Sequence, residues 1–179
     1  MLATYCSNTS KSRWKNPKRN RNSVALKVCI SSQMILTPLL MILKIICRMK
    51  LLWDTHTYLW LSSGSGELSE KIKKLIANDD TENYISIVSL WEITIKTGLG
   101  KLTINGNMTD VWNDISENGI SVLPLEFKHL KLYENLPLHH RDPFDRIIAS
   151  KAISENINLL SRDIVFDQYF QLANVKRIW

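Results

Sequence analysis

Four carboxylates in this sequence follow apolar segments or open predicted helices, so that one fold could bring them together. If they meet, they repel one another unless a cation lies among them or some of them carry a proton. A ligand set made only of oxygen suits Mg²⁺ or Mn²⁺ better than zinc. Because Mg²⁺ keeps bound waters and engages phosphate, such a set favours metal-assisted phosphodiester hydrolysis. The four candidates are Asp54, Glu92, Asp145 and Asp163.

Each candidate also has a purely structural interpretation. Asp54 and Asp163 each follow a predicted strand, where ligands bind in open parallel sheets, but either could instead cap the next helix. Glu92 stands three residues after Ser89, and Ser-x-x-Glu before an apolar stripe is a capping box. The position of each acid alone therefore leaves both interpretations open, and only their number favours a shared site.

Asp142 and Asp145 flank a Pro-Phe pair and compete for one role. Asp142 is well placed as an N-cap, because Pro143 then takes the first helical position, where proline is favoured. Asp145 falls in the first turn, where a negative charge suits the helix dipole. We therefore predict that Asp142 is the structural cap and that Asp145 is the ligand.

The elements expected between residues 49 and 179 alternate between strands and helices. Such alternation predicts an α/β fold with a central, mostly parallel sheet of four to five short strands, covered by helices on both faces. The pattern predicts strands at 51–53, 84–88, 120–123, 158–160 and 175–178, and helices at 55–61, 69–76, 89–98, 109–118, 127–136, 143–154 and 163–170.

Residues 1–48 differ in composition from the rest of the chain. They hold nine of the 23 basic residues, no acid and all three cysteines, whereas 49–179 has 14 basic and 17 acidic residues, a net charge of −3. A disulfide scaffold or thiolate zinc site is thus excluded for 49–179. We interpret 1–48 as a disordered leader or an over-long start. A targeting segment or membrane anchor is a weaker alternative, because the apolar run 34–47 is shorter than the about 20 residues of a spanning helix.

Four motifs in this order resemble the PIN-domain family, with the closest likeness to VapC-type toxins of bacterial type II toxin–antitoxin systems. They are Met49-Lys-Leu-Leu-Trp-Asp54-Thr-His, Ser86-Ile-Val-Ser-Leu-Trp-Glu92-Ile, His140-Arg-Asp-Pro-Phe-Asp145-Arg-Ile-Ile-Ala and Leu160-Ser-Arg-Asp163. The resemblance covers about 49–179, which would be a PIN-like nuclease domain. The leader is the departure from the family pattern.

The resemblance implies a PIN-like α/β/α sandwich and a Mg²⁺-dependent endoribonuclease, in which Mn²⁺ could substitute. Asp54, Asp145 and Asp163 would hold the metal, Glu92 would complete the shell or orient water, and Ser161 would support the site. The products would carry a 5′-phosphate and a 3′-hydroxyl. The implied partners are RNA and a small cognate antitoxin, with a homodimer left open. A cytoplasmic location without stable membrane association is expected.

Other polar and aromatic residues are weighed for binding. Arg141, Arg146 and Arg162 each adjoin a candidate acid, so they either grip RNA phosphates or pair with the neighbouring carboxylate. Three histidines lie in or beside expected loops and are interpreted as solvated rather than as ligands or bases: His56, His139 and His140. Three tryptophans lie within expected elements and are interpreted as core rather than base-stacking residues: Trp53, Trp60 and Trp91.

Two alternative functions are kept. A haloacid-dehalogenase-like phosphatase also begins with an aspartate after its first strand, but it needs a second aspartate two residues on, where this chain has His56. A non-catalytic α/β interaction module would retain the fold without binding a metal through these acids.

Overall fold

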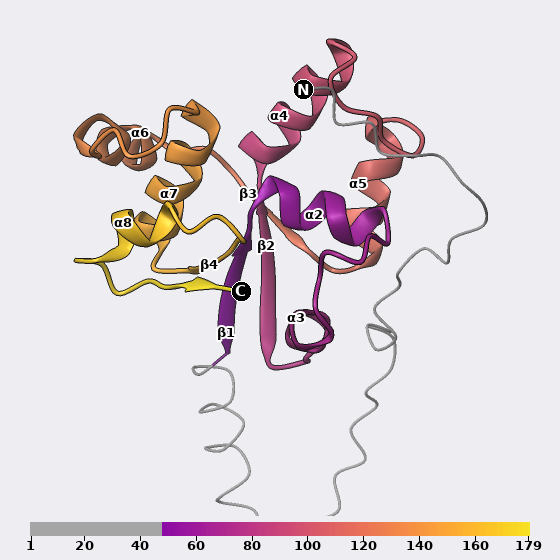
Figure 1. The fold of residues 1–179 in the computed structure, drawn as a ribbon, viewed down its shortest axis with the longest axis horizontal. Coiled ribbons are helices and arrows are strands. Elements are labelled where there is room, and N and C mark those ends of the chain that lie inside the picture. The colour runs from indigo at the N-terminus through magenta and orange to yellow at the C-terminus, as the bar shows by residue number, and fades with distance from the viewer. Residues whose placement is uncertain (1–47) are drawn as a thin grey trace, which may run out of the picture.

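The computed structural model describes residues 48–179 and shows one sheet of five parallel strands (Figure 1). The sheet order is β3-β2-β1-β4-β5. The predictions made for 1–47 lie outside the described residues, including the apolar run 34–47. The strands are β1 (Met49–Trp53), β2 (Thr81–Ser86), β3 (Ser121–Leu123), β4 (Asn158–Leu160) and β5 (Arg177–Ile178).

The central strand β1 is buried on both faces, which explains its unbroken apolar sequence. Leu51 and Trp53 face one hydrophobic cluster, and Leu52 faces the other. β1 pairs with β2 on one side and β4 on the other, with Trp53 opposite both Ile85 and Leu160. The carboxyl ends of β1, β2 and β4 therefore lie at one edge of the sheet.

Helices cover both faces, so the predicted α/β/α sandwich is confirmed. One face packs against α2 (Thr55–Ser62), α3 (Glu70–Ile76), α4 (Ile87–Gly98) and α5 (Met108–Glu117). The other packs against α7 (Pro143–Glu155) and α8 (Phe166–Phe170), and α6 (Phe127–Asn135) lies along α7 (Figure 1).

The start of α4 differs from the prediction. The strand expected at 84–88 is β2, which ends at Ser86, and the Ser86 side chain caps the helix by accepting a hydrogen bond from the Val88 N–H. Ser89 thus lies inside the helix, so the predicted Ser89–Glu92 capping box is wrong. Ile87 and Val88 suit either element, and periodicity over so short an apolar run cannot distinguish them.

Two C-terminal elements are shorter than predicted. The helix expected from Asp163 begins only at Phe166, because Asp163 accepts a hydrogen bond from the Val165 N–H and closes a turn first. The strand expected at 175–178 is limited to β5. None of the helices between residues 48 and 179 has the length and apolar character that crossing a membrane requires.

Candidate active site

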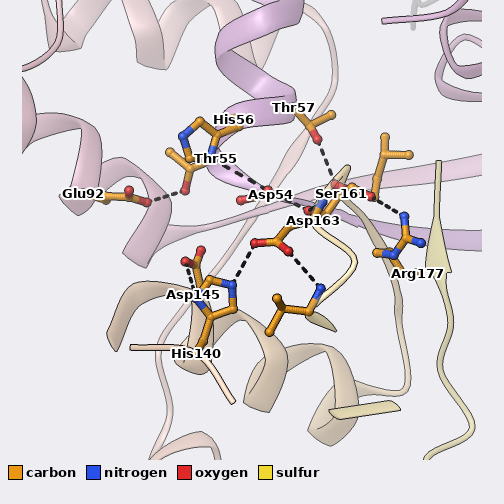
Figure 2. Close-up of polar contacts among 12 residues, drawn as sticks. Asp54, Thr55, His56, Thr57, Glu92, His140, Asp145, Ser161, Asp163 and Arg177 are labelled. Carbon is orange, nitrogen blue, oxygen red and sulfur yellow. Dashed lines mark hydrogen bonds and ion pairs between the residues drawn. The ribbon is translucent and has the colours of Figure 1, made fainter. Parts of the chain in front are cut away.

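The carboxyl ends of β1 and β4, the second turn of α4 and the first turn of α7 bring the four predicted acids to one edge of the sheet (Figure 2). Asp54 directly follows β1, and Asp163 lies three residues beyond β4. Glu92 is in the second turn of α4, and Asp145 is in the first turn of α7. Residues 109 positions apart in the sequence thus share one small region.

Asp54 is buried and is not a helix cap, although it occupies the N-cap position of α2. Its Oδ2 accepts a hydrogen bond of 2.8 Å from the Ser161 hydroxyl, whereas its buried Oδ1 has no hydrogen-bond partner in the described part of the chain. Burial raises the pKa of Asp54, and the charge of Glu92 adds to the rise, against the opposing effects of His56 and Ser161. A buried carboxylate oxygen without a partner is costly unless a ligand completes it.

Glu92 is buried and held from two sides. Its Oε2 accepts a 2.6 Å hydrogen bond from the Thr55 hydroxyl, and its Oε1 pairs with the Lys96 ammonium one turn further along α4. Burial would lower the pKa of Lys96, but the bond and charge of Glu92 outweigh it and raise that pKa. Glu92 therefore presents a fixed, charge-compensated carboxylate to the site.

Asp145 shows most clearly that negative charge is concentrated here. Burial raises its pKa to about 7, the charges of Asp54, Asp142 and Glu92 also raise it, and His140 acts in the opposite direction. Asp142 itself accepts a hydrogen bond from the Phe144 N–H, so its predicted role as the N-cap is confirmed. Asp145 is left facing the other acids.

His140 bridges Asp145 and Asp163, which corrects its interpretation as a solvated loop residue. Its Nδ1 lies 3.2 Å from Asp145 Oδ2 and its Nε2 lies 2.8 Å from Asp163 Oδ2 (Figure 2). One imidazole ring thus links the acid in α7 to the acid after β4. The side chain is mostly buried, with its ring against Phe166.

Asp163 joins the other acids through this bridge and through Ser161. Burial would raise the pKa of Asp163, but hydrogen bonds from Val165 and His140 outweigh it and lower that pKa. The Ser161 hydroxyl donates to Asp54 and accepts from the Asp163 N–H. One serine thereby connects the acid after β1 to the acid after β4, and the supporting position predicted for Ser161 has this geometry.

The arginines flanking the acids do not pair with them. Arg146 donates to the Tyr133 hydroxyl and to the Leu136 carbonyl, which ties α7 to the end of α6. Arg162 pairs with Glu67, and Arg141 is exposed. The alternative that each arginine neutralises its neighbouring carboxylate is therefore wrong for Arg146 and Arg162.

The exposure of the tryptophans and of the other two histidines agrees only in part with the prediction. Trp53 is buried as expected, but Trp91 is 58% exposed, so its interpretation as a core residue is wrong. His56 and His139 are exposed, and the His139 ring contacts Tyr169. Trp91 lies on the side of α4 opposite the buried Ile93, and its ring edge contacts Phe144.

Three residues that touch the acids escaped the sequence prediction as site residues. Lys96 was detectable, because a glutamate four residues before a lysine is a favoured helical pair. Thr55 was detectable only as a neighbour of Asp54, and nothing in the spacing of His140 shows that it reaches two acids. Such a bridge depends on how the loop before α7 folds back onto β4.

The residues present fit a divalent cation, although the side chains are not arranged as a closed ligand set. Between residues 48 and 179, no three His, Cys, Asp or Glu side chains are gathered in metal-binding geometry. The unpartnered Oδ1 of Asp54, the raised pKa of Asp145 and the purely carboxylate oxygen donors nevertheless suit Mg²⁺ or Mn²⁺.

Comparisons with known proteins identify a family and similar folds. The family model described as "PIN domain" matches residues 51–170. No curated protein matches the chain. Among solved structures, a chain of DNA-bound VapBC from Salmonella typhimurium has a TM-score of 0.51 at 15% identity, covering 72% of this chain and 98% of that one.

Two further structures show a similar overlap. A chain of VapBC2 from Rickettsia felis, bound to a promoter DNA fragment, has a TM-score of 0.49 at 18% identity, covering 72% of this chain and 98% of that one. A chain of VapBC-5 from Mycobacterium tuberculosis has a TM-score of 0.49 at 16% identity, covering 72% of this chain and 97% of that one.

The fold and the acidic edge define an α/β/α protein of the nuclease type. Because the family model spans most of the described residues, the chain belongs to the PIN-domain family, whose members are generally nucleases.

Proposed function

We propose that this protein is a Mg²⁺-dependent endoribonuclease and the toxin of a type II toxin–antitoxin system. The observation that carries the proposal is the grouping of Asp54, Glu92 and Asp145. Asp54 and Glu92 lie close enough to Asp145 to add to the rise of its pKa, while Asp54 Oδ1 has no partner in the described chain. A fold accepts such repulsion where a ligand relieves it.

Asp54, Asp145 and Asp163 are the residues that would hold the metal. Glu92, fixed by Thr55 and Lys96, would complete the shell or orient the attacking water. When bound, the cation lowers the pKa of a bound water and offsets negative charge on the scissile phosphate. Water attacks phosphorus and the bond to the 3′ oxygen breaks, which leaves a 3′-hydroxyl and a 5′-phosphate.

The test is cleavage of a labelled single-stranded RNA by the full chain in Mg²⁺, in excess EDTA, and with DNA of the same sequence. We expect RNA cleavage in Mg²⁺ only. Asp54→Asn should be inactive, and Asp80→Asn, an exposed aspartate just before β2, should be fully active. Cleavage that persists in EDTA or in Asp54→Asn would refute the metal-dependent mechanism, and no cleavage at all would favour a non-catalytic module.

An exposed aromatic surface beside the acids supports the toxin assignment. Trp91 is 58% exposed and contacts Phe144, which is the residue before Asp145. Large exposed aromatic residues beside a site are typical of protein interfaces, and an antitoxin segment lying there would cover the acids. Co-expression with the small protein encoded beside the gene should give a complex without RNase activity. Trp91→Ala should weaken that complex and leave cleavage by the free protein unchanged.

A phosphatase of the haloacid-dehalogenase type has no support. His56 occupies the position of its second aspartate, and it lies exposed on α2.

A further inference from the structure

One side of α2 carries two aromatic side chains, the exposed His56 next to Asp54 and the half-buried Trp60 further from the acids. His56 and Trp60 are four residues apart, so they lie on one side of the helix. The two ring centroids are 5.9 Å apart. His56 Nδ1 is 4.0 Å from Asp54 Oδ2, and the His56 side chain is 49% exposed. An accessible flat ring thus adjoins the proposed reaction centre.

A cation lies over the second ring. The guanidinium carbon of Arg162 is 6.0 Å from the ring centroid of Trp60. The ring centroids of Trp60 and Trp179 are 5.5 Å apart, in an edge-to-face arrangement. Arg162 follows Ser161, the serine that binds Asp54, so the loop after β4 places this cation beside α2. The Arg162 side chain is more than half exposed, and its ion pair with Glu67 is exposed too.

We propose that His56, Trp60 and Arg162 form a nucleotide-binding subsite for single-stranded RNA beside the acidic site. The base next to the cleaved phosphate stacks on the His56 ring, which Trp60 supports from behind, and Arg162 binds the following phosphate. This inference rests on the proposed nuclease function, because it takes the RNA strand to cross Asp54.

Three properties favour RNA over a protein segment. Unpaired bases stack on aromatic rings and arginine planes, and every base offers such a face. The surface combines two aromatic rings with a cation, the pair of features that binds bases and phosphates. Finally, an exposed ion pair such as Arg162–Glu67 contributes little to stability, so Arg162 can exchange Glu67 for a phosphate at low cost.

The experiment measures binding of a fluorescein-labelled single-stranded RNA decamer by anisotropy, in full-length protein that carries Asp145→Asn and does not cleave. The segment 1–48 contributes equally to every variant of this chain. His56→Ala should raise Kd by about 5- to 100-fold, the range for loss of one stacked base. His56→Phe keeps a flat ring and should bind within about twofold of the parent.

Arg162→Gln and Glu67→Gln form a matched pair, because both break the same ion pair and only the first removes the cation. Arg162→Gln should weaken binding and reduce the slope of log K against log salt by about 0.7, the value for one phosphate contact on a single strand. Glu67→Gln should bind at least as tightly as the parent.

Three results would overturn the subsite. They are parent-like binding by His56→Ala, equally weak binding by His56→Phe and His56→Ala, or equal weakening by Glu67→Gln and Arg162→Gln. The side chains changed relative to the Asp145→Asn parent are all exposed, and thermal melting of each variant should match that parent. Cleavage by the unmodified chain is scored separately, so loss of the subsite with retained RNase activity refutes only this inference.

Discussion

Helix α7 contains a partly buried aspartate, Asp145, and a fully buried lysine, Lys151, six residues apart, and their surroundings differ in charge. Lys151 is completely buried, yet its ammonium donates to the Ser86 hydroxyl at 2.9 Å and to the Leu123 carbonyl at 2.8 Å. Asp145 faces Asp54 and Glu92, and His140 Nδ1 lies 3.2 Å from its Oδ2. The lysine has neutral acceptors on both sides, whereas the aspartate has like charges.

The difference separates a structural group from a candidate site. Burial lowers the pKa of Lys151 to about 8, and Glu155 and Glu126 oppose that shift. Its partners lie at the ends of β2 and β3, so it ties two strands to α7. Burial and repulsion raise the pKa of Asp145 to about 7. Perturbed groups of both kinds occur in folded proteins, but only the group with unrelieved repulsion calls for a ligand.

The largest expected effect is on RNA cleavage, which should depend on Asp145 and not on Lys151. Asp145→Asn should reduce Mg²⁺-dependent RNA cleavage by more than about 100-fold, because loss of a direct ligand should exceed the 10- to 100-fold cost typical of second-shell changes. Lys151→Met, which keeps the length of the side chain, should retain cleavage per folded molecule. Single-turnover assays measure both, and an active Asp145→Asn variant would remove Asp145 from the site.

The next largest effect is on the free energy of unfolding, which should fall on loss of Lys151 and rise on neutralisation of Asp145. Lys151→Ala leaves a cavity and two buried acceptors without a donor, so we expect a loss of about 2–5 kcal/mol in the free energy of unfolding. Asp145→Asn relieves repulsion and should raise the free energy of unfolding at pH 8 in EDTA. Urea unfolding measures both, and a Lys151→Ala protein as stable as the parent would show that the buried lysine ties nothing together.

The free energy of unfolding should change with pH in opposite directions in the two ranges where Asp145 and Lys151 titrate. Between pH 3.8 and about 7 the folded state keeps a proton on Asp145 that the unfolded chain has released, so stability falls as pH rises. Between about pH 8 and 10.5 folded Lys151 has lost a proton that the unfolded chain retains, so stability rises with pH. Urea titrations in EDTA should lose the first slope in Asp145→Asn and the second in Lys151→Met.

Stabilisation of the protein by added metal should depend on Asp145, at the start of α7, and not on Lys151. Mg²⁺ at 100 times its Kd should stabilise the protein by about 2.7 kcal/mol at pH 8, which is above the Asp145 pKa of about 7, and by less at pH 5.5. Lys151→Met should keep this gain, and Asp145→Asn should lose most of it. Thermal melting with and without EDTA measures the shift, and an equal shift in both variants would place the metal elsewhere.

The smallest effect concerns the cap of the same helix. Asp142→Ala removes the acceptor for the Phe144 N–H and should cost about 0.5–2 kcal/mol of stability. Cleavage per folded molecule should survive, because the other acids stay in place. Thermal melting and single-turnover assays on Asp142→Ala and Asp145→Ala check the assignment, and exchanged phenotypes would show that the two roles are reversed.

The local sequence was sufficient for the elements whose ends carry strong signals. The bounds of β4 and the start of α7 match the prediction, because an apolar strand and an Asp-Pro pair restrict the backbone locally. The start of α4 was wrong, because Ile87 and Val88 fit a strand or a helix equally well. Strand pairing between β2 and β3, which ends at Ser86 opposite Leu123, decides between them.

The sequence by itself determined that Asp54 and Asp163 lie at the same edge, since a parallel sheet places the residues after its strands there whatever the details of packing. Only the tertiary structure decided how each is held. Thr55 reaches Glu92 and His140 reaches Asp163 through contacts across 37 and 23 residues of chain, which no local pattern encodes. Burial of Asp54 and exposure of Trp91 likewise depend on which neighbouring elements cover them, because the free energy of placing a charge or a ring depends on its surroundings.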